Sequence, residues 1–260
     1  PRADLSLLLD RLSAPSVAGS LKATVKGPQT ALAVDANGRF PQLYGAPGAL
    51  DVSAVADIPG QSVRISRLTA NARGEALKLE APVKVSYGKT LGVDRLRATL
   101  APPGVSPANI DIAGTVKPAL NMTASLKNVT PALAKPFAPT LHAAGTLAAD
   151  AKLSGTLEAP RGHVQLNGRG LKMMTGDAAS LPPAQSDATA DLAGTTARLN
   201  ARASAGPKLS LSADGTVPTS KTGPINLRTA GKLDLSLADA ILGASGRQAL
   251  GLANFDITVG

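Results

Sequence analysis

The chain has 260 residues, a formal net charge of +9 and no cysteine. The absence of cysteine excludes disulfide bonds and thiolate metal sites. Its 27 Lys and Arg residues are scattered singly along the sequence, without the basic clusters and interleaved aromatic residues of nucleic-acid-binding proteins, which argues against a nucleic-acid partner.

Apolar residues make up 43% of the chain, but aromatic residues only 2%. Aromatic side chains usually supply much of the area buried in a compact core, so we expect a thin layer of Leu, Val, Ile and Ala instead. The 26 Gly and 20 Pro residues disfavour long helices and suit short strands closed by turns. The chain starts at Pro1 and stops at Gly260 just after a strand-like segment, so we interpret it as an internal piece of a longer protein.

Residues 1–14 are predicted to form a short amphipathic helix. Their leucines recur at i, i+3, i+4 and i+7, which places them on one helical face. These leucines are Leu5, Leu8, Leu9 and Leu12. Asp4 is a suitable N-cap, and Pro15 would end the helix.

Beyond residue 15, apolar and polar residues alternate, a pattern typical of strands with one apolar and one solvated face. The pattern occurs at residues 21–26, 63–66, 77–80, 83–86, 96–100, 110–112, 164–166, 209–212 and 233–237. No linker divides these segments, so residues 1–260 are expected to form one continuous β segment. No run of 18 apolar residues that would span a bilayer as a helix occurs among them.

Three dipeptides between strand-like segments predict hairpin turns, because their residues tolerate positive φ. They are Asn37-Gly38, Asn167-Gly168 and Asp214-Gly215. The segment His163–Met173 is accordingly interpreted as one complete hairpin. Two longer loops are expected at Ala101–Pro107 and Thr175–Gln185, which are rich in Pro and small residues.

A short phrase centred on Gly recurs at irregular intervals. It reads AGSL at 18–21, AGTV at 113–116, AGTL at 144–147, SGTL at 154–157, AGTT at 193–196, DGTV at 214–217 and AGKL at 230–233. Gly inside a strand marks a bend, a bulge or a close approach of another group. A sheet with many such points is expected to curl.

The continuous apolar face of such a sheet must be covered. A second sheet could pack against it, which would give a closed core. Alternatively, the sheet could curl into an open trough filled by an apolar ligand such as lipid acyl chains, because an exposed apolar face of this size is rare in soluble monomers. The residues predicted to line that groove are Leu147, Leu153, Leu157, Val164, Leu166, Leu209, Leu211, Leu233, Leu235 and Leu237.

Polar residues give no sign of catalysis. His142 and His163 lack further metal ligands at close spacing and are interpreted as exposed or hairpin-end residues. The carboxylate pairs Asp187/Asp191 and Asp234/Asp239 lie in strand-like or turn segments and are interpreted as solvated. The Gly-Arg-Gly at 168–170 lacks the strand and helix of a phosphate loop. The three methionines, Met122, Met173 and Met174, suit either lipid contacts or gap filling.

Two segments carry a resemblance to a known family. Ala119–Met173 resembles the TamB family of the AsmA-like superfamily, with its Gly-Thr-Leu strand, an SGTL-x-AP phrase at 154–160, a further strand that contains Gly162, and an Asn-Gly turn at 167–168. Ala230–Gly260 is similar to a later module of that family. The matching positions there are Gly231, Leu233, Leu235, Leu242, Gly246 and Arg247.

The resemblance implies an elongated, curled, mostly antiparallel all-β sheet with an apolar groove, here with one or two short helices. It also implies a non-enzymatic role: carrying phospholipid along the groove between the inner and outer membranes and supporting outer-membrane biogenesis. The full-length protein would be periplasmic, anchored in the inner membrane, and would act with an Omp85-type partner through other parts of its chain. No metal or cofactor is expected.

Two other functions stay open from the residues alone. A structural or adhesin-like β-protein would share the strands but have a closed core. An enzyme acting on polysaccharide or peptide would need a cleft with convergent polar or aromatic groups, and the scarcity of aromatic residues argues against it.

Overall fold

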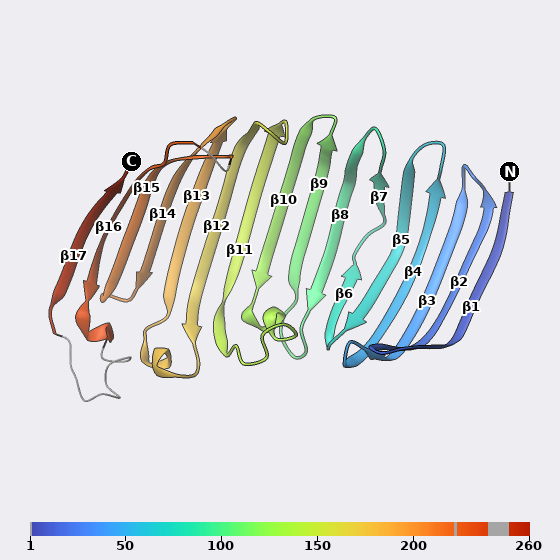
Figure 1. The fold of residues 1–260 in the computed structure, drawn as a ribbon, viewed down its shortest axis with the longest axis horizontal. Helices are drawn as coiled ribbons and strands as arrows, with labels where there is room; N and C mark the ends of the chain where they lie inside the picture. Colours follow the sequence, from blue (N-terminus) through green and yellow to red (C-terminus); the bar gives the residue numbers. More distant parts are fainter. Residues whose placement is uncertain (1, 221–222, 239–249) are drawn as a thin grey trace. The chain divides into compact units, whose positions relative to one another are not determined.

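A computed structural model describes residues 2–220, 223–238 and 250–260, and its described part is all-β (Figure 1). The chain divides into two compact units, Pro1–Ser125 (unit 1) and Leu126–Gly260 (unit 2). The boundary falls within the strand β10 (Leu120–Val129). The expectation of one continuous segment therefore stays a prediction, and each unit is described by itself.

Unit 1 consists of strands that pair antiparallel with their neighbours in the sequence. They are β1 (Arg2–Ala14), β2 (Val17–Pro28), β3 (Leu32–Leu43), β4 (Ala46–Asp57), β5 (Ser62–Ala72), β6 (Glu75–Leu79), β7 (Val83–Ser86), β8 (Leu91–Ala101), β9 (Ala108–Lys117) and the start of β10. Both β6 and β7 pair with β5 on one side and β8 on the other. They act as one strand interrupted at residues 80–82, where Pro82 lacks an N–H for the ladder.

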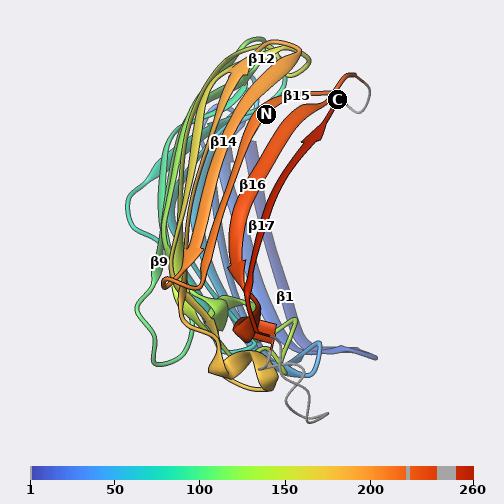
Figure 2. The ribbon, with the colours of Figure 1, turned by 90° about the vertical axis from the view of Figure 1, so that its left-hand side faces the viewer.

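Unit 2 continues the same pattern with short 3-10 turns at the strand ends. Its elements are η1 (Pro131–Ala134), β11 (Ala143–Gly155), β12 (Pro160–Met173), η2 (Asp177–Ser180), β13 (Ala184–Ala193), β14 (Thr196–Ala205), β15 (Leu209–Pro218), β16 (Asn226–Asp234), η3 (Leu235–Ala238) and β17 (Leu252–Val259). Figure 2 shows its strands bowed along their length, with η2 and η3 on the hollow side at one end. The predicted all-β, antiparallel and curled sheet is confirmed, and its short helices are 3-10 turns in the described residues.

The predicted helix over residues 1–14 is wrong, because this segment is the strand β1. Its leucines satisfy a period of two as well as the helical spacing. Leu5, Leu7 and Leu9 pair with Val25, Ala23 and Leu21 of β2. The ladder with β2 satisfies the backbone groups that a single short helix would have to stabilise alone.

The predicted Asn-Gly and Asp-Gly turns are also wrong, because all three dipeptides lie inside strands. The predicted hairpin His163–Met173 is part of the single strand β12. Gly168 lies where a Cβ would approach Leu171 Cδ1 within 2.8 Å and Leu147 Cδ2 within 3.2 Å. It therefore makes room for neighbouring leucines, a tertiary requirement that the local turn signal does not contain. The two long loops fall in the expected places, between β8 and β9 and between β12 and β13.

Several glycines of the recurring phrase do bend or tighten the sheet. The pairing register shifts at Gly19 and at Gly145, which marks bulges. A Cβ at Gly215 would overlap the carbonyl oxygen of Asn226 on the neighbouring strand. Gly155 and Gly194 instead end a strand or occupy a turn. The recurring phrase therefore corresponds to several local structures, namely bulges, close approaches of strands, a strand end and a turn, rather than to one repeated structure.

Candidate functional site

The pairing registers of β11 to β17 align the residues of unit 2 into rows that cross the strands. Five successive rows lie on the same side of the sheet, since neighbouring rows on one face are two residues apart. They are Leu171, Ala184, Ala205, Leu209, Leu233 and Ala253; Leu147, Gly168, Ser186, Ala203, Leu211, Gly231 and Phe255; Ala149, Leu166, Ala188, Ala201, Ala213, Thr229 and Ile257; Ala151, Val164, Ala190, Leu199, Gly215, Leu227 and Val259; and Leu153, Gly162, Leu192, Ala197 and Val217. We call this surface the apolar face of unit 2.

No position in these rows holds an acidic or basic residue, and only Ser186 and Thr229 are polar. An alternation that is consistent in each strand therefore becomes a continuous aliphatic surface across β11 to β17. Ala and Gly occupy many positions between the larger side chains.

Within unit 2, no second layer of strands packs on the apolar face. The described strands of this unit contact their neighbours in the sheet and the turns η1 and η2. On the face itself only Ala197, Ala205 and Gly168 are buried, whereas Leu166 is 42% exposed and Ile257 55% exposed. An uncovered aliphatic surface of this kind marks a site for an apolar ligand or partner.

The structure places seven of the ten predicted groove residues on the apolar face. They are Leu147, Leu153, Val164, Leu166, Leu209, Leu211 and Leu233. Leu157 lies in the connection between β11 and β12 and is exposed. Leu235 and Leu237 leave the strand pattern, because β16 ends at Asp234 and both belong to η3.

Other face residues were missed by the sequence interpretation. They include Leu192, Leu199, Val217, Leu227, Phe255 and Ile257. The strands β13 and β14 do alternate with a period of two. The residue on the apolar face is often Ala, which is too weakly hydrophobic for the alternation to stand out in the sequence. Only the register, which sets Leu199 beside Ala190 and Gly215, shows that these residues continue the same surface.

The opposite side of unit 2 is polar and carries cross-strand ion pairs. Arg169 donates two hydrogen bonds to the carboxylate of Asp187, at 2.8 and 2.9 Å, and Arg228 pairs with Asp256. The hydrogen bond from Arg169 is the main cause that lowers the pKa of Asp187. These pairs hold neighbouring strands in one register on the side that faces water.

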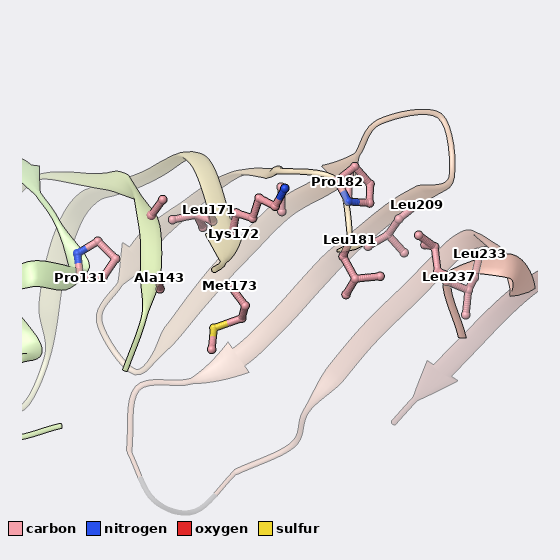
Figure 3. A pocket seen from close by; sticks show the side chains of 13 residues that line it. Pro131, Ala143, Leu171, Lys172, Met173, Leu181, Pro182, Leu209, Leu233 and Leu237 are labelled. Carbon is pink, nitrogen blue, oxygen red and sulfur yellow. The ribbon is translucent and has the colours of Figure 1, made fainter. Parts of the chain in front are cut away.

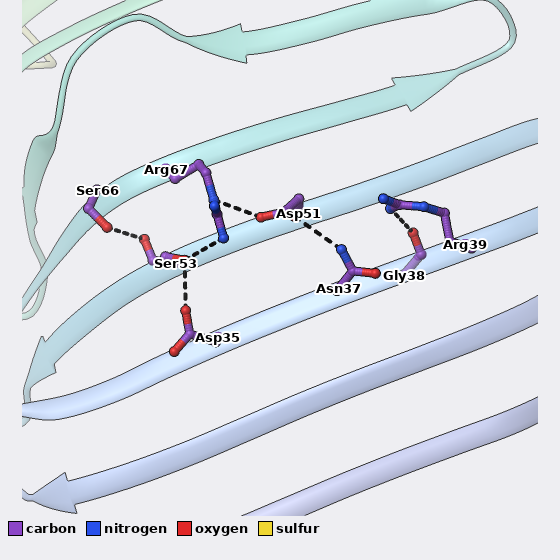
Figure 4. Close-up of polar contacts among 8 residues, drawn as sticks. All are labelled: Asp35, Asn37, Gly38, Arg39, Asp51, Ser53, Ser66 and Arg67. Atoms are coloured by element: carbon purple, nitrogen blue, oxygen red, sulfur yellow. Dashed lines mark hydrogen bonds and ion pairs between the residues drawn. The ribbon is translucent and has the colours of Figure 1, made fainter.

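Unit 1 has the same two-sided character. Figure 4 shows its polar side, where Arg67 pairs with Asp51 at 2.8 Å and Ser53 donates to Asp35 at 2.7 Å across β3, β4 and β5. Its apolar side includes Leu50, which pairs with Gly38 and Ala70.

One acidic residue interrupts the apolar side of unit 1. Glu75 pairs with Ala72, which in turn pairs with Gly48 next to Phe40. Its Oε1 atom is buried and accepts no hydrogen bond, and desolvation raises the pKa of this carboxyl group. No corresponding charge occurs on the apolar face of unit 2.

A pocket of about 570 Å³ opens at one end of the apolar face of unit 2 (Figure 3). Its wall combines face residues with residues from the turns: Pro131, Ala143, Ala144, Leu171, Lys172, Met173, Leu181, Pro182, Ala184, Ala205, Leu209, Leu233 and Leu237. Lys172 is the one charged residue in this wall. The volume lies within the range of about 300–1,000 Å³ that is usual for small-molecule sites.

The polar candidates do not assemble into a catalytic or metal site. His163 lies on the polar side, with Nδ1 at 2.7 Å from Asp191 Oδ1, and Asp187 binds Arg169. The Nδ1 atom of His142 lies 2.9 Å from the carbonyl oxygen of Thr140. Within residues 2–220, 223–238 and 250–260 no group of three His or acidic residues could hold a metal ion.

Some expectations fall on residues that the structure does not describe. Asp239, Leu242, Gly246 and Arg247 lie outside the described residues. In the described part of the chain, no helix has the length and hydropathy needed to cross a bilayer.

No family model, curated protein or solved structure matches this chain. What the apolar face can do therefore follows from its own chemistry.

Proposed function

We propose that this chain is a non-enzymatic β segment that carries phospholipid acyl chains on its apolar face. The observation that carries the proposal is the face itself: β11 to β17 present aliphatic side chains without a charge, and no second layer among the described strands of unit 2 covers them. Each methylene group that leaves water for such a surface contributes about 0.8 kcal/mol when fully buried. An acyl chain offers many of them and needs no hydrogen-bonding partner.

The shape of the lining also favours movement of a chain over fixed binding. Polar groups in a ligand site fix the orientation of the ligand, and the face offers only Ser186 and Thr229. The many Ala and Gly residues leave few deep recesses to trap a particular group. The resulting contacts are weak and similar from one strand to the next, as lateral transfer requires.

The wider setting is a proposal that rests on the resemblance of Ala119–Met173 and Ala230–Gly260 to TamB-type sequences. In that setting the chain is a periplasmic part of a longer protein that bridges the inner and outer membranes. An Omp85-type outer-membrane protein would act with other parts of the full-length protein.

A structural or adhesin-like protein with a closed core is the second candidate. It would need a face-to-face partner for the leucines, and the described strands of unit 2 do not supply one. The exposed side chain of Leu166 lies in the middle row, where a closed core would bury it most deeply.

A crosslinking experiment on the 260-residue chain tests the proposal. A photoreactive apolar residue is placed at Leu166 on the apolar face or at Gln165, its neighbour on the polar side. We expect phospholipid to be captured at position 166 and not at 165 after incubation with vesicles, as read by mass spectrometry. Equal capture at both positions, or capture at neither, would reject the proposal.

A substitution experiment asks whether the face also supports transfer. Leu153→Arg places a charge on the apolar face, whereas Lys152→Arg keeps the charge of the adjacent polar position. We expect the first variant to slow transfer of a fluorescent phospholipid between vesicles at least tenfold and the second to transfer normally, because a charge in an apolar layer is costly. Normal transfer by the Leu153→Arg variant would contradict the proposal.

A further inference from the structure

The pocket at the end of the apolar face has an apolar interior and a basic mouth. A second hollow of about 610 Å³ shares Lys172, Leu181, Pro182 and Leu237 with it. The additional residues of this second hollow are Ser180, Pro207, Lys208 and Ser236. The apolar pocket therefore adjoins a hollow whose lining includes two lysines and two serines.

Three connections of unit 2 hold this mouth together. Pro182, which follows η2, lies beside Gly206 in the turn between β14 and β15, where a Cβ would come within 3.7 Å of the proline. The same turn carries Lys208, whose carbonyl oxygen accepts a 2.8 Å hydrogen bond from the N–H of Asp234. The turn η3 follows Asp234 directly. This hydrogen bond therefore holds Lys208 next to η3, which contributes Leu237 to the pocket.

The charges around the mouth are unbalanced in favour of the lysines. Lys172 and Lys208 line the site, and none of its described lining residues is acidic. Lys208 Nζ donates to Ser236 Oγ at 3.0 Å. Lys208 also interacts with Asp234, whose pKa is lowered mainly by hydrogen bonding with Ser236 and also by Lys208. The carboxylate of Asp234 accepts a 2.9 Å hydrogen bond from the N–H of Ser236. Part of its hydrogen-bonding capacity is therefore used by the backbone of η3 rather than by Lys208.

Figure 3 shows how Lys172 lies relative to the apolar side chains of the pocket. The Lys172 side chain extends along the pocket toward Pro182, while Leu181, Leu209, Leu233 and Leu237 lie around the apolar interior. An amphiphile that inserts an acyl chain between these leucines would leave its head group beside the two ammonium groups.

The geometry points to a site at the end of unit 2 that binds one acyl chain of an amphiphile and holds its anionic head group with Lys172 and Lys208. The inference rests on the proposed function in that both concern acyl chains, but it adds a fixed position and a preference for negative charge. Phosphate and carboxylate head groups share the required chemistry, because each presents several acceptors to the ammonium donors. Head groups would be kept at the edge of the sheet while the chains cover the face.

A binding experiment with the 260-residue chain separates head-group recognition from chain binding. The probes are a fluorescent fatty acid and its methyl ester, which have the same chain and differ in head-group charge. We expect the acid to bind about fivefold more tightly than the ester at low salt, the size typical of an exposed ion pair. The ratio should fall toward one as the salt concentration rises.

Matched lysine variants then locate the effect. Lys172→Gln combined with Lys208→Gln should abolish the preference for the acid and leave the affinity for the ester unchanged. Lys152→Gln combined with Lys232→Gln removes the same charge from the polar side of β11 and β16 and should keep the fivefold ratio. A preference that survives in the first variant, or is absent in the unaltered chain, overturns the inference.

Two further arms test the chain and the source of the anion. Leu181→Gln should weaken acid and ester binding by a similar factor, and unchanged binding of both probes would overturn placement of the chain in this pocket. Glycerol 3-phosphate, which has the charge without an acyl chain, should not displace the fatty acid at comparable concentration. Displacement would show a site for anions alone and would reject binding of an amphiphile.

Phospholipid capture at Leu166 without any head-group preference would reject only this inference. A head-group preference without capture at Leu166 would reject only the proposed function.

Discussion

The two sides of the sheet in unit 2 are built from adjacent residues but follow different physical rules. On the apolar face, contacts are non-directional, and Gly and Ala adjust the depth of each row. On the polar side, paired groups such as Arg169 and Asp187 define specific cross-strand partners. The polar side therefore offers specific contacts between neighbouring strands, whereas the apolar face is left to contact something outside unit 2.

The first expected effect, the largest, concerns a glycine of the apolar face. Gly162 has φ +138°, and a Cβ there would overlap the carbonyl oxygen of Lys152 on β11. Gly162→Ala should lower the free energy of unfolding by about 3 kcal/mol or more, because the clash is with backbone that cannot move alone. Urea unfolding measures this loss.

The control for this prediction is Gly176→Ala. Gly176 also has positive φ, at +73°, but a Cβ there would meet nothing within 4 Å. Its substitution carries only the backbone strain of about 1 kcal/mol. Equal losses in the two variants would show that close strand approach at Gly162 is unimportant.

The second prediction compares polar substitutions at two neighbouring positions, one on the apolar face and one on the polar side. Leu199 lies on the apolar face between Ala190 and Gly215, and Asn200 lies on the polar side between Thr189 and Asp214. Leu199→Asp should cost about 2–3 kcal/mol, since it loses aliphatic contact and brings a charge into an apolar row. Asn200→Ser keeps the position polar, adds no charge opposite Asp214, and should change stability by less than about 0.5 kcal/mol. Similar losses from both substitutions in urea unfolding would refute the assignment of sides.

Much of this two-sided design was predictable from the residues. Successive side chains of a strand point to opposite faces, so alternation of apolar and polar residues is visible in the local sequence. Segments such as Val164–Leu166 and Leu209–Leu211 therefore predict both the strand and its apolar side. Seven of the predicted groove residues share one face for this reason. The registers that join them across strands depend on bulges and turns, which the alternation alone does not locate.

The errors occurred where two local patterns compete or where a distant contact decides. Residues 1–14 satisfy both helical and strand spacing, and the partner strand β2 decides between them. Asn167-Gly168 has the chemistry of a turn, but Gly168 is needed beneath Leu171 and Leu147. The hollow that contains Lys172 and Lys208 was not predictable either. These two lysines are far apart in the sequence and come together only through the turns that follow β12 and β14.

The third prediction tests whether a charge on the apolar side of unit 1 is unfavourable there. Burial raises the pKa of Glu75, so at neutral pH its ionised form opposes folding. Glu75→Gln should therefore stabilise the chain, by less than about 1 kcal/mol because the residue is partly exposed. The gain should shrink as pH falls through the raised pKa toward the ordinary value near 4.5, where the carboxyl group becomes neutral in both states.

Urea unfolding at pH 4 and pH 7 measures this gain. The matched variant is Glu158→Gln, which changes an exposed residue between β11 and β12 and should not alter stability at either pH. A Glu75→Gln variant that is less stable at pH 7 would mean that the carboxylate has a favourable role on this side of the sheet.

The last and smallest expected effect concerns the register pair on the polar side. Arg169 lowers the pKa of Asp187 through their hydrogen bonds, so the ionised pair stabilises the folded chain above the ordinary carboxyl pKa near 3.8 and loses that contribution as pH falls through the lowered value. Asp187→Asn should lower Tm by only about 1 °C at pH 7, since both side chains are exposed. Combined with Arg169→Gln in a double-mutant cycle, it isolates the pair. A zero coupling would assign the register to backbone pairing and the bulges, whereas a coupling that disappears as pH falls through the lowered pKa of Asp187 would assign part of it to this ion pair.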